Sequence, residues 1–119
     1  AQKLLWASCL WLICHANGGR TVESVHNSDS CSRQLRRLVE ELLPIIRSQT
    51  DASRAMPELE LDSVLANLER YSRNIPNAIP SKTLAINEIR FRNGWFLDHA
   101  DKAAQPFHLQ LLGENGIHR

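Results

Sequence analysis

Leu4–Cys14 reads LLWASCLWLIC, an apolar run broken by a single serine, and whether it is kept or removed decides how the rest of the chain is interpreted. Lys3 precedes the run, and the small residues Ala16 and Gly18 follow it. A basic start, a short apolar run and small residues are typical of an export signal. The run is much shorter than the roughly 20 residues that cross a bilayer as a helix. We therefore predict a cleaved signal peptide at residues 1–18 and a secreted, extracellular protein that keeps no membrane anchor.

The same run has a second interpretation, as a buried helix of the folded domain. Its side chains leave no polar face, so such a helix needs cover on every side. A chain of 119 residues offers little material for that cover. Under this interpretation the apolar segment stays in the protein. The chain would then be a small, non-enzymatic structural subunit of a membrane-associated or multi-protein assembly.

The composition fits one domain of ordinary globular character. The chain has 14 basic and 13 acidic residues, and 43% of its residues are hydrophobic. This balance does not favour nucleic acid as a partner, because phosphate binding depends on concentrated positive charge. Residues 19–30 are polar and aperiodic, which predicts a flexible N-terminal segment. Residues 31–119 are then expected to form a single helical domain.

Cysteine usage gives little support to a disulfide scaffold. Cys9 and Cys14 lie in the predicted signal, which leaves Cys31 alone after cleavage. Cys31 is then either free or paired with a cysteine of another chain, as an intermolecular disulfide. Cys9, Cys14 and His15 do not have the spacing of a zinc site. We predict no metal and no cofactor.

Two amphipathic helices are predicted in the middle of the chain. The first begins near Asp29–Ser32 and must kink at Pro44 or stop near Leu43. The second begins at Pro57 and ends at the asparagines and prolines of residues 74–80. Apolar residues recur at helical spacing in both: Leu35, Leu38, Val39, Leu42 and Ile46, then Leu61, Val64, Leu65, Leu68 and Tyr71. The pattern predicts a mainly α protein, a small up-down helical bundle.

The C-terminal third admits two interpretations. Asn93-Gly94 is the strongest short signal for a β-hairpin turn, because both residues tolerate positive φ. Two helices, over residues 81–92 and 95–104, are the slightly favoured alternative. Residues 106–112, PFHLQLL, alternate in the manner of a strand.

Neither a catalytic site nor a nucleic-acid site is predicted. The pairs Glu40-Glu41 and Asp98-His99 are adjacent in sequence, so their side chains point apart and do not converge. Basic and aromatic residues interleave at residues 90–96, a pattern that can stack on single-stranded nucleic acid. With the charges nearly balanced, we interpret these residues as core aromatics flanked by solvated arginines.

Residues 32–49, SRQLRRLVEELLPIIRSQ, resemble the first helix of interleukin-13, one of the short-chain four-helix cytokines (interleukins 3, 4 and 13). The residues that carry the resemblance are Ser32, Leu35, Arg36, Leu38, Val39, Glu40, Glu41, Leu42, Ile45 and Gln49. An export signal and a short polar lead before this helix also fit the family, and interleukin-3 similarly has the Cys-Ser pair seen here at residues 31–32. The resemblance implies a helical bundle without enzymatic activity.

The resemblance also implies a cytokine-like ligand of a cell-surface protein receptor, with a role in immune signalling. The exposed face of the first helix would then bind the receptor through Arg33, Arg36, Arg37 and Glu40. Arg37 stands where interleukins 4 and 13 have an acidic residue that meets their shared receptor chain. This charge reversal implies a different receptor.

Overall fold

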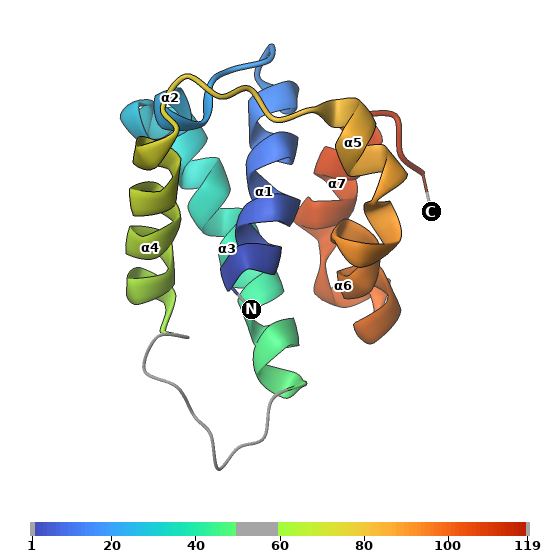
Figure 1. Ribbon diagram of the computed structural model, residues 1–119. Coiled ribbons are helices and arrows are strands. Elements are labelled where there is room, and N and C mark those ends of the chain that lie inside the picture. The colour runs from blue at the N-terminus through green and yellow to red at the C-terminus, as the bar shows by residue number, and fades with distance from the viewer. Residues whose placement is uncertain (1, 50–59, 119) are drawn as a thin grey trace.

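The computed structural model describes residues 2–49 and 60–118, and all regular structure in these ranges is helical (Figure 1). The protein is therefore mainly α, and its arrangement is compatible with a helical bundle. The α-helices are α1 (Gln2–Ala16), α2 (Val22–Asn27), α3 (Asp29–Ser48), α4 (Leu61–Asn74), α5 (Lys82–Asn87), α6 (Asn93–His99) and α7 (Pro106–Glu114). Two short 3-10 segments, η3 (Ile89–Phe91) and η4 (Lys102–Ala104), flank α6.

The apolar N-terminal segment forms the central helix, α1. It contacts α2, α3, α4, α5 and α7, and in Figure 1 it lies between α4 on one side and α5 to α7 on the other. All residues from Leu5 to Cys14 except Trp6 and Ala7 are buried. The chain thus provides the cover that a helix apolar on every side requires. Cleavage after Gly18 stays a prediction.

Helix α3 supplies the largest amphipathic surface of the core. It begins where predicted, with the Ser28 hydroxyl accepting a hydrogen bond from the Cys31 backbone N–H at 3.2 Å. It continues through Pro44 to Ser48, so the helix does not stop at Leu43. Pro44 lies on the exposed face, while its neighbours Leu43 and Ile45 are buried. Packing of this apolar face against α1 offsets the hydrogen bond that the proline removes.

Helix α4 confirms the second predicted helix. The predicted start at Pro57 lies outside the described residues. Val64 and Leu68 are buried, whereas Tyr71, one turn from the end, is exposed. The segment after Asn74 crosses one end of the molecule and leads to α5 (Figure 1).

The prediction of a β-hairpin around Asn93-Gly94 is wrong, because both residues belong to α6. Neither has a positive φ, whereas the tight hairpin turn predicted for Asn-Gly needs positive φ at both positions. Asn93 is fully buried and bonds to other helices, so tertiary contacts override its local turn preference.

The strand pattern at residues 106–112 is also wrong, since these residues lie in α7. Pro106 occupies the first turn, where its missing N–H removes no helical hydrogen bond. The Glu41 carboxylate accepts hydrogen bonds from the next two backbone N–H groups, of Phe107 at 3.0 Å and His108 at 2.8 Å. A partner from α3, 65 residues earlier in the chain, therefore caps α7.

The N-terminal segment at residues 19–30 differs from the flexible segment predicted. It contains α2, in which Val22 and Val25 are buried. The Thr21 hydroxyl accepts a hydrogen bond from the Ser24 backbone N–H at 3.3 Å and begins the helix. Two apolar residues three positions apart are enough to dock one short, capped helix on the core.

Candidate functional site

The four residues predicted to bind a receptor share one exposed face of α3. Arg36 forms ion pairs with Glu40 at 3.1 Å and with Asp62 of α4 at 3.3 Å. The Arg37 guanidinium lies over the Phe107 ring, 4.1 Å from its centroid. Arg33 donates a hydrogen bond from Nε to the Asp29 carbonyl at 3.2 Å. These side chains are accessible, but each already has a partner within the chain.

Cys31, predicted to be free or to pair with another chain, points into the core and is 1% exposed. A disulfide with a second chain would require α3 to move away from its neighbours. Cys9 and Cys14 are buried as well, and all three thiols are free. Burial raises the pKa of Cys14 to about 12 and also raises the pKa of Cys9, so both remain protonated at neutral pH.

A buried polar network joins α1 to the C-terminal helices. The Trp11 indole N–H donates to the Asn93 side-chain oxygen at 2.8 Å. The Asn93 amide nitrogen donates to the Ser8 carbonyl at 2.9 Å and lies 3.0 Å from His108 Nε2. His108 Nδ1 lies 2.8 Å from the Gln105 side-chain oxygen. Each polar group of Asn93 is therefore satisfied inside the core.

The network defines the protonation of His108. Because the Asn93 amide nitrogen can only donate, Nε2 of His108 accepts, and Nδ1 carries the proton that it donates to Gln105. Gln105 in turn donates from Nε2 to the Phe96 carbonyl at 2.9 Å. Burial lowers the pKa of His108 to about 4, so the imidazole is neutral at pH 7.

Two more ring N–H groups fix α1 at its ends. Near the start, Trp6 Nε1 donates to the Ser72 hydroxyl of α4 at 3.0 Å. Near the end, His15 Nε2 donates to the Pro80 carbonyl, 2.7 Å away in the loop before α5. Together with Trp11, these bonds tie α1 to three separate parts of the chain. Specific polar pairing of this kind positions a helix within a fold.

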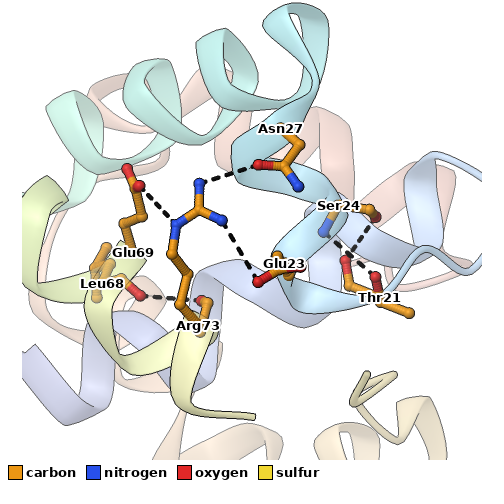
Figure 2. A network of polar contacts seen from close by, with 8 residues as sticks. Thr21, Glu23, Ser24, Asn27, Leu68, Glu69 and Arg73 are labelled. Atoms are coloured by element: carbon orange, nitrogen blue, oxygen red, sulfur yellow. Dashed lines mark hydrogen bonds and ion pairs between the residues drawn. The ribbon is translucent and has the colours of Figure 1, made fainter. Parts of the chain in front are cut away.

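A surface network joins α2 to the end of α4, as Figure 2 shows. The Arg73 guanidinium contacts Glu69 at 2.9 Å, Glu23 at 3.5 Å and the Asn27 side-chain oxygen at 3.0 Å. The hydrogen bond to Glu69 is the main cause that raises the pKa of Arg73. Backbone pairing adds to this link, since the Val22 N–H donates to the Ala78 carbonyl at 2.9 Å.

Exposed large apolar side chains are concentrated in one segment, which we call the Tyr71–Phe91 surface. It includes the end of α4, the loop to α5, α5 and η3, which follow one another along one end and side of the molecule (Figure 1). Phe91 is 73% exposed and Ile79 55%. All large hydrophobic side chains that are exposed in residues 2–49 and 60–118 belong to this segment: Tyr71, Ile75, Ile79, Leu84, Ile86 and Phe91.

Two hollows lie along α4, and Tyr71 lines one of them. One of about 270 Å³ lies between α1 and α4, where the rings of Trp6 and Tyr71 meet edge to face at 4.6 Å. The other, of about 360 Å³, lies between α2, α3 and α4 and has His26, Arg33 and Glu69 on its wall. The buried Nε2 of His26 has no hydrogen-bond partner among the described residues, and burial lowers the pKa of this histidine.

Neither a metal site nor a membrane-spanning helix is present in the described ranges. In residues 2–49 and 60–118, no three metal-ligating side chains gather closely enough to hold an ion. No helix in these ranges is both long enough and apolar enough to cross a membrane.

Sequence reasoning missed the polar residues that organise the core. Asn93 reads as a turn residue, His108 as one of several scattered histidines, and Glu41 as a surface charge. No local pattern marks them, because Glu41 bonds to residues 66 and 67 positions away and Asn93 bonds to Ser8 and Trp11, 85 and 82 positions away.

No protein-family model matches the chain, and searches of curated proteins and of solved structures find no similar protein.

Proposed function

We propose that the chain is a non-enzymatic docking subunit of a larger assembly, built as a helical bundle that keeps residues 2–16 as its core helix. This is the second of the two interpretations that the sequence allows. The single observation that carries it is the buried pairing of Trp11 with Asn93. An export signal that is cut off has no need of a hydrogen-bonding partner in the mature domain.

The energetics of α1 support its retention. Removing residues 1–18 would open the centre of the core and leave Asn93, which also bonds to His108, without its partners Trp11 and Ser8 on α1. Each buried aliphatic or aromatic side chain that loses its cover costs about 1.5–3 kcal/mol, which together exceeds the stability of a typical domain. A folded domain without α1 is therefore not expected.

The docking role is supported by the Tyr71–Phe91 surface. Single exposed apolar residues are common on any protein, but a concentration of them in one segment is typical of a contact surface. This surface is formed by short helices and a loop that the rest of the fold holds in place. Trp6 and His15 of α1 connect it to the core through their bonds to Ser72 and Pro80.

Two measurements test the proposal. Mass spectrometry of the protein isolated from the cells that make it gives the mature N-terminus, and we expect α1 to be present. A variant that lacks residues 1–18 should lose cooperative thermal unfolding and most of its helical circular dichroism signal. A mature chain starting at Gly19, or a truncated variant that unfolds as cooperatively as the full chain, would contradict the proposal.

A second candidate is the secreted receptor ligand, which is supported by the shared exposed face of Arg33, Arg36, Arg37 and Glu40 on α3. Labelled full chain is added to cells, and its binding is compared with that of an Arg33→Glu variant. Under this candidate the substitution weakens binding, and Lys102→Glu, an equal charge change on η4, does not. Equal binding by all three proteins would eliminate the receptor interface.

A further inference from the structure

The charges around the Tyr71–Phe91 surface are as unevenly distributed as its apolar groups. Residues 70–92 contain five basic residues and one acidic residue, Glu88, whereas the whole chain is almost balanced. Arg73 and Arg92 form ion pairs with glutamates. Arg70, Lys82 and Arg90 make no ion pair within residues 2–49 and 60–118, so their charge is available to a partner.

Basic and apolar groups alternate closely along this segment. Lys82 lies in α5 one turn before the exposed Ile86, and α5 also carries the exposed Leu84. The Arg90 guanidinium lies 5.5 Å from the centroid of the Phe91 ring, which is the most exposed large apolar side chain described. A partner must therefore take up apolar side chains and supply negative charge within a few ångströms of them.

We propose that the Tyr71–Phe91 surface binds an anionic membrane surface, with its apolar side chains inserted among the lipids and Arg70, Lys82 and Arg90 against the headgroups. This inference rests on the proposed docking role and names its partner. Interfacial binding combines burial of apolar side chains at the acyl boundary with attraction of lysine and arginine to anionic lipids. The charge complementarity is direct, since the unpaired charges of the surface are all positive.

Lipid suits this surface better than a peptide does. A peptide usually docks in a groove that holds its anchor side chains. Of the six apolar side chains of the surface, only Tyr71 lines one of the two hollows, the one between α1 and α4. The other five are exposed on the loop after α4, on a helix of six residues and on a 3-10 turn. Projecting side chains enter a lipid surface without needing a cavity in either partner.

Vesicle co-sedimentation of the full chain tests the proposal. We expect binding to vesicles of equimolar phosphatidylcholine and phosphatidylserine, and much weaker binding to phosphatidylcholine alone. High salt should weaken the binding, because it screens the exposed charges. Phe91→Ser should reduce the partition coefficient roughly five- to tenfold, because an exposed ring no longer leaves water. Phe91→Leu, which keeps an apolar side chain, should retain most of the binding.

Two charge-reversal variants distinguish an effect of where a charge lies from an effect of the net charge of the protein. Arg90→Glu should reduce binding to the anionic vesicles at least about fivefold, because each basic residue near the surface contributes about 1 kcal/mol. Arg33→Glu changes the net charge by the same amount but lies on α3, and it should bind nearly as the unmodified chain does. All of these side chains are exposed, so circular dichroism should show every variant folded.

Absence of binding to the anionic vesicles at low salt would overturn the lipid proposal. So would equal losses for Arg90→Glu and Arg33→Glu, which would indicate attraction by net charge alone. If no vesicle binds but Phe91→Ser abolishes capture of a protein partner, the partner is a protein and the docking role stands. A failure of the proposed function is seen separately, as a mature chain that starts at Gly19 or as a truncated variant that unfolds as cooperatively as the full chain.

Discussion

Helix α1 and the Tyr71–Phe91 surface both carry large apolar side chains, but in opposite environments. In α1, Trp11 is 1% exposed and its N–H bonds to Asn93, whereas Phe91 is 73% exposed beside Arg90. The first is covered by five other helices. The second also carries Arg70, Lys82 and Arg90, which form no ion pair within residues 2–49 and 60–118. Apolar residues therefore stabilise the fold at one site and are available for binding at the other.

The largest expected difference between the two regions is in stability. Trp11→Ala should lower the free energy of unfolding by about 3–5 kcal/mol, because it opens a cavity and leaves the Asn93 oxygen without a donor. Phe91→Ala should change it by less than about 0.5 kcal/mol, since most of the ring already faces water. Urea unfolding followed by circular dichroism measures both. Similar losses for the two variants would show that α1 is not the core helix.

The polar network of α1 should make stability depend on pH. The folded pKa of His108, about 4, lies below its ordinary value of 6.5, so the unfolded chain binds the proton first as the pH falls. The stabilisation is complete above about pH 6.5 and is lost toward pH 4, by up to about 3 kcal/mol. The lowered pKa of His26 acts in the same direction. Unfolding of the full chain and of His108→Gln between pH 4 and 7 measures this contribution.

In His108→Gln the dependence between pH 4 and 6.5 should be flatter than in the unmodified chain. The carboxylates titrate in both proteins, so the difference between the two curves isolates the histidine. Parallel curves would mean that His108 is accessible to protons in the folded state, and that the network between α1 and α7 is open.

Replacing Glu41 should lower the stability by a smaller amount, and the adjacent Glu40 serves as its control. Glu41→Ala removes the carboxylate that accepts the N–H groups of Phe107 and His108, and it should cost about 1–2 kcal/mol. Glu40→Ala removes an exposed pair with Arg36 and should cost at most about 0.5 kcal/mol. Thermal unfolding of the two variants compares adjacent glutamates in different environments. A larger loss at Glu40 would contradict the cap on α7.

The smallest effect is expected at the surface network of Figure 2. Arg73→Met should lower the melting temperature less than Glu41→Ala does, because Arg73 and its partners are open to solvent. The difference from the unmodified chain should shrink in high salt, which screens exposed pairs. Thermal unfolding at low and high salt tests this, and a loss independent of salt would point to packing rather than charge.

The C-terminal third shows where local signals were insufficient. Asn93-Gly94 and the alternation of residues 106–112 are sound local patterns, and both predicted the wrong element. Asn93 is drawn into the core by Trp11 and His108, and Pro106 begins a helix that Glu41 caps. Trp11 and Glu41 are remote from these residues in sequence, so no local window contains them.

The sequence by itself determined the helices α3 and α4, because the apolar stripe of each lies within one stretch of chain, and the cap of α3, Ser28, lies directly before it. It also determined that Leu4–Cys14 must be covered or removed, since a helix without a polar face cannot remain in water. Only the tertiary structure showed how the chain covers it, with helices from every later part of the sequence and with hydrogen bonds from Trp6, Trp11 and His15. The tertiary structure also decided which apolar residues remain exposed, because burial depends on where the other helices lie.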